Sequence, residues 1–413
     1  MSFLETLNGY GKDAVLDRIR KEGIREYGVE NADLAYKVEK ALEDHCEEEP
    51  MIVAGGLNNH DFSGMLLQIV REEPQKVLNG LETIAYVSGA ERKILYLPET
   101  ETELAGSLKK EIGELGLHIE VENGIVDARL LRDGITCHVE TLAAVADAVE
   151  GKYQADTLVS VVKYTDSETM EEVKAPAYVG FGTAVKELTG SLEGVKAVQV
   201  GDTLYLPEEV EGLVLTKETA LGDGVIKVYT EGCCLLDSAV KKLLESRKKS
   251  CGKCTFCREG LLQLYTRMKE IVDGKGDPAS PGIMEEIGRA MAFSGSCTLG
   301  NNGSAFVLET LKKFGNEYTD HIKKKKCTAG TCTAFINMYI DPGKCTGCGK
   351  CIPACADDLI EGLPGYIHMI EDVDCTKCGT CMETCPEDAI VRTTANVPRI
   401  PDRLTRVGRF KRY

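Results

Sequence analysis

Two similar cysteine-rich runs lie close together in the sequence: C345-T-G-C348-G-K-C351-I-P-A-C355 and C375-T-K-C378-G-T-C381-M-E-T-C385-P386. Both have the spacing C-x2-C-x2-C-x3-C, which holds two [4Fe–4S] clusters and passes the fourth cysteine of each run to the other cluster. Thiolates suit iron, and two-residue spacers let one tight loop direct three of them to one cubane. The predicted ligand sets are Cys345, Cys348, Cys351 and Cys385 for one cluster, and Cys375, Cys378, Cys381 and Cys355 for the other.

Two other uses of these cysteines are less consistent with the spacing. Zinc ribbons also contain C-x2-C pairs, but they close with four ligands in two pairs, whereas each run here has three cysteines followed by a fourth. Disulfides belong to secreted proteins, and the N-terminus does not resemble a signal peptide. Two clusters so close in sequence indicate transfer of single electrons.

Composition limits the class of protein. A chain of 413 residues suits two to four domains. A net charge of −17 and the absence of Trp argue against a nucleic-acid surface. No run approaches the roughly 18 consecutive apolar residues of a membrane span, and 18 cysteines without a secretory signal indicate a reducing compartment. We therefore expect a cytoplasmic protein with no direct membrane span.

The first 150 residues alternate between strand-like and helix-like patterns. An amphipathic helix is expected over 33–45. Strands are expected over 51–56, 93–98 and 118–122, and helices over 62–70, 77–88 and 102–115. Such alternation predicts an α/β domain with a mainly parallel sheet. Residues 151–232 instead contain short β-like runs separated by glycine-rich turns, which predict a small β-rich domain.

A third cysteine site lies in the helical region that follows. The loop S250-C251-G-K-C254-T-F-C257-R-E-G260 presents three cysteines at two-residue spacing, and Cys297 follows in G295-S-C297-T-L-G300. The alternative, a redox C-x-x-C motif with a spare cysteine, belongs near a thioredoxin-like βαβ pattern that this region lacks. We predict that Cys251, Cys254, Cys257 and Cys297 hold a third [4Fe–4S] cluster.

These motifs resemble a known family. The loop around Cys251, the distant Cys297 and the segment 306–322 resemble the cluster-bearing helical bundle of the NADH-binding flavoprotein subunit of complex I. The two-cluster tail is similar to the long form of that subunit in bifurcating hydrogenases. The resemblance implies a flavoprotein-like α/β domain over 1–150, a β-grasp domain of the soluble-ligand-binding (SLBB) type over 151–232, a helical bundle over 233–325, a bacterial-ferredoxin-like α+β domain over 326–395 and a basic tail over 396–413.

The chain departs from the family where the family binds flavin and NADH. The family's G-R-G-G-A-G-F loop has no counterpart in residues 1–50, and its N-x-D-E-G-x-P-G motif is replaced by G55-G-L-N-N-H-D-F62. Its G-E-E-x-A-L segment is missing from 123–134. The paired Asn of its N-N-V-E-T motif are replaced by Cys137 and His138. Bound FMN is therefore not expected.

A cysteine pair between the bundle and the tail has two interpretations. Cys327 and Cys332 lie in C327-T-A-G-T-C332. In the resembling long-form subunits a similar pair contributes to a zinc site, so Cys327 and Cys332 are candidate zinc ligands with His321 or His368 as a partner. The alternative is two free thiols in a linker. The basic stretch 399–413 is either solvated or docks onto an acidic partner.

These features predict an electron-transfer subunit of a multi-subunit oxidoreductase. It would relay electrons through three [4Fe–4S] clusters between partner redox sites, without its own flavin. The expected partners are other subunits, such as a flavoenzyme or hydrogenase, and ferredoxin. The main alternative is an NADH-oxidising FMN subunit of a hydrogenase- or formate-dehydrogenase-type complex, whose flavin pocket uses unrecognised residues. A cluster-stabilised scaffold is a third interpretation.

Overall fold

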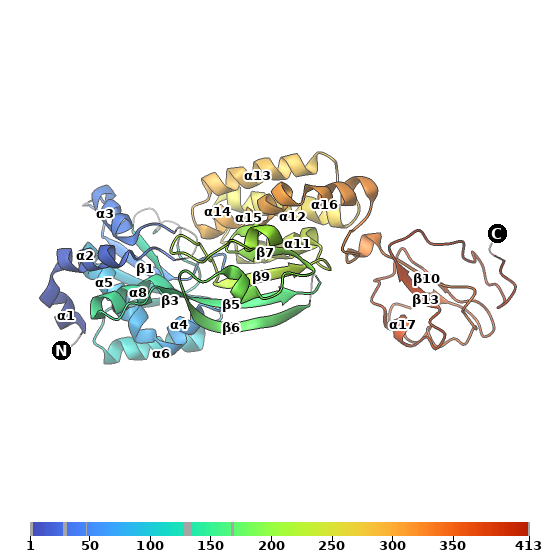
Figure 1. Cartoon of the computed structure of the whole chain (residues 1–413), viewed down its shortest axis with the longest axis horizontal. Helices are drawn as coiled ribbons and strands as arrows, with labels where there is room; N and C mark the ends of the chain where they lie inside the picture. Colours follow the sequence, from blue (N-terminus) through green and yellow to red (C-terminus); the bar gives the residue numbers. More distant parts are fainter. Residues whose placement is uncertain are drawn as a thin grey trace. The chain divides into compact units, whose positions relative to one another are not determined.

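The computed structural model describes residues 3–27, 31–46, 48–127, 130, 134–166 and 169–411 (Figure 1). The chain divides into two compact units. The first comprises residues 1–267 and 279–314, and the second comprises residues 268–278 and 315–413. Among the described residues, no helix combines the length and apolar character needed to cross a membrane.

A four-stranded sheet forms the centre of the first part of the chain. Its strands are β1 (Ile52–Gly56), β2 (Arg92–Leu97), β3 (Glu120–Asn123) and β4 (Ile135–His138). They are arranged in the order β3-β2-β1-β4, and every neighbouring pair is parallel. The connections run outward from β1 in both directions, so the carboxyl ends of β1 and β4 flank the point where binding crevices form in such sheets. The predicted parallel α/β domain is confirmed.

Helices cover this sheet. Their bounds are α1 Phe3–Tyr10, α2 Lys12–Glu22, α3 Leu34–Asp44, α4 Leu67–Glu72, α5 Pro74–Ser88, α6 Thr102–Glu114 and α8 Val139–Glu150. The expected helix over 33–45 is α3, and Asp33 caps it by accepting a hydrogen bond from the Tyr36 N–H at 2.8 Å. The expected helix over 62–70 is wrong in its first half. The Asp61 carboxylate accepts hydrogen bonds from the Ser63 and Gly64 N–H groups, so a turn forms before α4.

The β-rich part is a five-stranded sheet with the order β6-β5-β9-β7-β8. Its elements are β5 Asp156–Tyr164, β6 Met170–Gly180, α9 Val185–Thr189, β7 Val195–Val200, β8 Thr203–Tyr205, α10 Pro207–Val210 and β9 Val225–Thr230. The β5–β9 pair is parallel and the other pairs are antiparallel. Valine and leucine side chains from these strands form a core of their own, in which Val159, Val198 and Ile226 are fully buried. The β-grasp assignment stays a prediction.

Helices α11 (Leu235–Lys249), α12 (Thr255–Val272), α13 (Ser280–Ser294), α14 (Thr298–Asn302) and α15 (Ala305–Lys313) follow the sheet (Figure 1). Helix α15 contacts α11, α13 and β8. The turn before α14 packs very closely against α14 itself. A Cβ atom on Gly295 would lie 2.1 Å from the Asn301 side chain, so only glycine fits there. This turn positions Cys297.

The second unit consists of short elements joined by long loops. They are α16 Gly315–Thr319, the π-helix η1 Asp320–Lys324, the 3-10 helix η2 Thr333–Phe335, β10 Asn337–Ile340, β11 Ile360–Glu361, β12 Met369–Ile370, α17 Thr380–Glu383 and β13 Ile390–Thr393. Strands β10 and β13 pair antiparallel, as do β11 and β12. The core between them includes Met338, Ile340 and Ile390 together with cysteines of both runs.

Candidate metal centres

The first cysteine loop of the second unit begins directly after β10. The Cys345 N–H donates a hydrogen bond to the Asp341 carbonyl at 3.0 Å. Gly347 follows with a φ of +73°. A Cβ atom there would lie 2.8 Å from the backbone of Gly365 and Tyr366, so the loop requires glycine at this position. The second loop repeats the turn after β12, with Lys377 at a φ of +61°.

The fourth cysteine of each run has the same local environment. The Cys355 Sγ accepts a hydrogen bond from the Leu359 N–H at 3.4 Å, and the Cys385 Sγ accepts one from the Ala389 N–H at the same distance. Hydrogen bonds to ligand sulfur tune the reduction potential of iron–sulfur clusters. The repeat seen in the sequence is therefore also a structural repeat.

The cysteines assemble into two groups that each combine both runs. Burial, together with the negative charges of Cys345, Cys348 and Cys385, raises the pKa of Cys351 to about 11. Burial likewise raises the pKa of Cys381, with added contributions from Cys375, Cys378 and Cys355. The fourth cysteine of each run thus lies with the first three of the other run. That these groups are the ligand sets of two clusters stays a prediction.

These groups fit iron–sulfur clusters. The first four thiols, those of Cys345, Cys348, Cys351 and Cys385, line one cavity. Thiolates this close repel one another, and bound iron would remove that repulsion. The donor set and its enclosure therefore suit a [4Fe–4S] cluster.

The third cysteine group lies in the first unit. Cys251, Cys254 and Cys257 lie at the N-terminus of α12, and Cys297 immediately precedes α14. Burial raises the pKa of Cys257, and the charges of Cys297, Cys254 and Cys251 add to this effect. The Ser250 hydroxyl lies 3.6 Å from the Cys257 sulfur. The N-terminus of an 18-residue helix favours the negative charge that four thiolates and a cluster bring.

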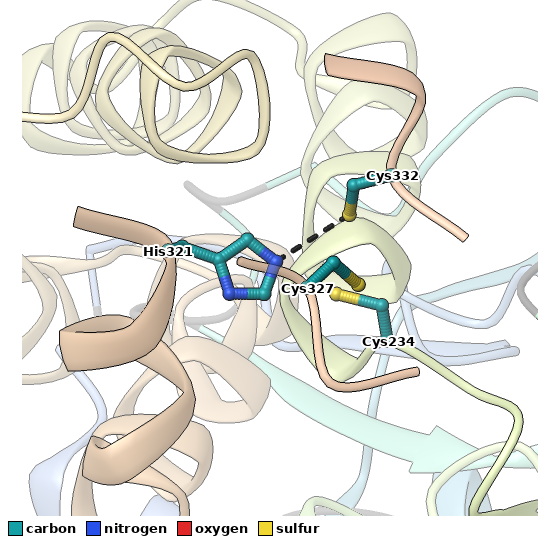
Figure 2. Close-up of side chains that lie close together, drawn as sticks. All are labelled: Cys234, His321, Cys327 and Cys332. Atoms are coloured by element: carbon teal, nitrogen blue, oxygen red, sulfur yellow. Dashed lines mark hydrogen bonds between the residues drawn. The ribbon is translucent and has the colours of Figure 1, made fainter. Parts of the chain in front are cut away.

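A separate group of possible ligands comprises His321, Cys327 and Cys332. All three are buried, and their ligand atoms lie within 4.8 Å of one another. The His321 Nδ1 lies 2.8 Å from the Glu317 carbonyl. Because a carbonyl only accepts, Nδ1 carries the proton and Nε2 presents its lone pair. Figure 2 shows this nitrogen directed at the Cys332 sulfur, 3.5 Å away. A backbone-oriented histidine beside thiols is the usual arrangement of a zinc ligand.

The structure places His368, the other candidate partner of this pair, elsewhere. Its Nδ1 lies 3.9 Å from the Cys345 sulfur, in the first cluster group. Gly362 lacks the side chain that would occupy this space, since a Cβ there would lie 2.2 Å from the His368 ring. His368 is therefore a neighbour of the cluster loop rather than a member of the group around Cys327.

The crevice at the carboxyl ends of β1 and β4 brings together the segments that depart from the flavoprotein motifs. Its lining includes residues 56–59, Val126 and residues 136–138. The Asn59 side chain accepts a hydrogen bond from the Val126 N–H at 3.0 Å and donates one to the Val126 carbonyl at 3.2 Å. The Glu26 carboxylate accepts one from the His138 N–H at 2.5 Å.

These contacts do not fit a flavin phosphate. A phosphate needs clustered, available backbone N–H groups, whereas the N–H groups of Val126 and His138 already donate to oxygens of the chain itself. The buried Glu26 would also repel a phosphate. Asp61, the carboxylate left in the segment 55–62, accepts hydrogen bonds from its own turn, and burial raises its pKa to about 6.

Comparison with known proteins agrees with this organisation. Residues 239–321 match the NADH-ubiquinone oxidoreductase-F iron-sulfur binding region, and residues 344–390 match a 4Fe-4S dicluster domain. The chain is 26% identical to the NADP-reducing hydrogenase subunit HndC of Solidesulfovibrio fructosivorans over 84% of each chain. The chain is thus similar to HndC over most of the length of both proteins. The two matched regions are iron–sulfur-binding regions, and the resemblance expected from the sequence is confirmed.

Other relatives match more narrowly. The F subunit of NADH-quinone oxidoreductase from Streptomyces coelicolor is 29% identical over 30% of this chain and 27% of its own length. A solved NAD+-reducing [NiFe]-hydrogenase, in the H2-reduced state, has a similar fold, with a TM-score of 0.60 at 19% identity. That match covers 76% of this chain and 63% of the hydrogenase chain.

The sequence missed several residues of these sites. Glu26 and Asn59 had no recognised role, and Asn59 contacts a residue 67 positions away. His60 likewise had no assigned role, and its Nε2 lies 3.8 Å from the Asp202 carboxylate. No local spacing marks such long-range contacts.

Proposed function

We propose that this chain is an electron-transfer subunit of a redox complex that relays single electrons through three [4Fe–4S] clusters. The observation that carries the proposal is the grouping of cysteines into three sets of four, each with a thiol whose pKa is raised by burial and by the charges of the other three. Homology to subunits of hydrogenase and quinone-oxidoreductase complexes supports partner subunits.

Each bound cluster would supply one-electron redox chemistry. The chain's contribution is to hold the clusters and to set their potentials. Backbone N–H groups of Leu359 and Ala389 donate to cysteine sulfur, and the N-terminus of α12 favours a negatively charged cluster. Cys351 and Cys381 are buried, which limits access of water to the clusters.

The proposal includes the absence of a flavin belonging to this chain. It rests on the Asn59–Val126 and Glu26–His138 hydrogen bonds, which occupy the backbone groups that a phosphate would need. The alternative is an FMN-binding, NADH-oxidising subunit. The match of residues 239–321 to the NADH-ubiquinone oxidoreductase-F region favours this alternative, because that region is named for an NADH-linked enzyme.

We further propose a zinc site formed by His321, Cys327 and Cys332 (Figure 2). Cysteine and histidine ligands hold zinc in closed structural sites with tetrahedral geometry. The role of this site would be structural.

The test of the relay uses the full chain, purified without oxygen. Dithionite should bleach the visible iron–sulfur absorbance, and added NADH should leave it unchanged, with or without excess FMN. Calorimetric titration with NADH should show no binding at micromolar concentration. Stoichiometric FMN retained through gel filtration, together with bleaching by NADH, would establish the flavoprotein alternative. Clusters that dithionite cannot reduce would favour the scaffold interpretation.

A further inference from the structure

The basic stretch 399–411, which we name the arginine strap, folds back onto its own unit. The Ile367 N–H donates a hydrogen bond to the Thr405 carbonyl at 2.9 Å, and the Val407 N–H donates one to the Gly365 carbonyl at 3.1 Å. The Arg406 guanidinium lies over the Tyr366 ring, 5.7 Å from its centroid. The strap is therefore attached to the loop 363–367 by two backbone hydrogen bonds and by a side-chain contact.

That loop lies directly against the first cluster loop. The Gly365 N–H donates to the Gly347 carbonyl at 3.0 Å, and a Cβ on Gly347 would collide with Gly365 and Tyr366. Gly347 stands between the ligands Cys345 and Cys348, and Cys348 is exposed. The strap is thus one loop away from a cluster that lies near the protein surface.

Charge separates the strap from the cysteine-rich region that precedes it. Residues 399–411 contain five basic residues and one carboxylate, whereas residues 327–398 contain ten carboxylates and four basic residues. Arg399, Arg403 and Arg409 are exposed. Within the described part of the chain, none of these three forms an ion pair with a carboxylate. The strap is a local positive surface on a chain with a net charge of −17.

Apolar side chains lie among these charges. Leu363 is 50% exposed, Leu404 is 47% exposed and Val407 is 38% exposed. Leu363 belongs to the loop 363–367. Leu404 and Val407 belong to the strap that is hydrogen-bonded to this loop. Exposed apolar residues with charged neighbours are typical of interaction surfaces, in which apolar contacts give affinity and the charged rim guides encounter.

We infer that the arginine strap and the loop 363–367 form a docking surface for an acidic one-electron carrier protein. The partner's carboxylates would pair with Arg399, Arg403 and Arg409, and its cofactor would approach the cluster of Cys345 and Cys348. One electron would pass between the two proteins, so that one is oxidised as the other is reduced, with no bond made and no proton transferred. The inference deepens the proposed relay, since it assigns one end of the relay to a surface.

The experiment measures binding of an oxidised, acidic two-[4Fe–4S] ferredoxin to the immobilised full chain, under argon and at low ionic strength. We expect Arg403→Glu to weaken binding on the order of fivefold, because opposite charges at an interface rim steer association. The effect should disappear near 1 M salt, where the screening length is about 3 Å. Arg403→Gln, which only removes the charge, should produce about half of the effect on the logarithmic scale.

Arg392→Glu is the matched control, because Arg392 is an exposed arginine of β13 in the same unit, outside the strap. It should change binding less than twofold. Equal weakening by Arg392→Glu, binding that salt does not affect, or no binding of the ferredoxin to the wild-type chain would overturn the inference. Iron content and visible spectra of each variant establish that the clusters are intact.

This result is separable from the test of the relay. Binding of an oxidised carrier requires no electron transfer, so it can succeed or fail independently of cluster reduction by dithionite. If dithionite reduces the clusters but the strap variants bind normally, the docking surface fails and the relay stands.

Discussion

The Asn59 side chain pairs with the backbone of Val126 through two hydrogen bonds, at 3.0 and 3.2 Å, and so closes the crevice at the end of β1 from within. In a parallel sheet this crevice is where ligands bind. Here a side chain of the protein occupies the backbone groups that a ligand would use. The same pair therefore contributes to stability and argues against a flavin.

Asn59→Ala should lower stability without creating a flavin site. The change leaves a buried N–H and a buried carbonyl without partners, at a cost of about 1–3 kcal/mol. Asn58→Ala is the control, because Asn58 donates a single, half-buried hydrogen bond to Gly222. Thermal unfolding by circular dichroism compares the two variants, and FMN retention through gel filtration is measured on both. Stoichiometric FMN bound to Asn59→Ala would show that this contact alone keeps flavin out.

The carboxylate of Asp61 should make stability depend on pH. Burial raises its pKa to about 6 in the folded protein, whereas the unfolded value is about 3.9. The folded chain therefore binds a proton before the unfolded chain does, and stability from this group increases as pH falls through 6. Between pH 8 and 5 the gain is about 1–2 kcal/mol. Asp61→Asn should lack this gain, so the difference in melting temperature between the two proteins should shift by a few degrees. A difference that is constant over this range would contradict the assignment.

The sequence predicted the parts of the fold whose signals are local. Helix α3 has a capping Asp33 and helical periodicity, and β1 is a short apolar run that ends in glycines, so both elements were expected. The first half of the helix expected over 62–70 failed because one side chain, Asp61, satisfies the N–H groups of its own turn. Periodicity cannot detect that competition.

Site residues, too, were predictable only where their signal is local in the sequence. Cysteine spacing carries the geometry of a cluster loop, so the exchange of Cys355 and Cys385 between the two runs follows from the spacing alone. Contacts between distant segments carry no such signal. Glu26 lies 112 residues from His138, whose N–H donates to its carboxylate, and the strap reaches Gly365 from Val407. Only tertiary packing brings these pairs together.

The anaerobically purified chain should contain about 12 iron atoms and as many acid-labile sulfides, which correspond to three clusters of four. Colorimetric iron and sulfide assays on the protein give this number directly. A reproducible iron and sulfide content that corresponds to only two clusters would show that one of the three cysteine groups holds no cluster. The Cys251 group would then be the first to doubt, since Cys297 reaches it from a separate turn.

Cys332→Ala should abolish zinc binding and leave iron unchanged. The wild-type chain should carry about one zinc, because His321, Cys327 and Cys332 form a buried ligand group. Cys46→Ala is the control, since Cys46 is exposed and lies outside that group. Zinc and iron are measured together by mass spectrometry after metal-replete growth. Zinc that survives in Cys332→Ala, or that is absent from the wild type, would contradict the site.

Cys355→Ser should damage the cluster of the other run. Cys355 belongs to the first run in sequence, but its charge acts on Cys381, which lies with Cys375 and Cys378. Replacement of a thiolate by a hydroxyl weakens iron ligation, so the cluster held by Cys375, Cys378 and Cys381 should lose iron or become a three-iron species. Cys385→Ser is the matched variant and should damage the cluster of Cys345, Cys348 and Cys351 instead.

Double variants test this assignment. Each single variant is combined with Cys348→Ser or Cys378→Ser, and electron paramagnetic resonance of the reduced protein counts the signals of the clusters that remain. Cys355→Ser should add little damage to Cys378→Ser, because both changes affect one cluster, whereas with Cys348→Ser it should remove both clusters of the second unit. The reverse pattern would mean that each run keeps its own fourth cysteine.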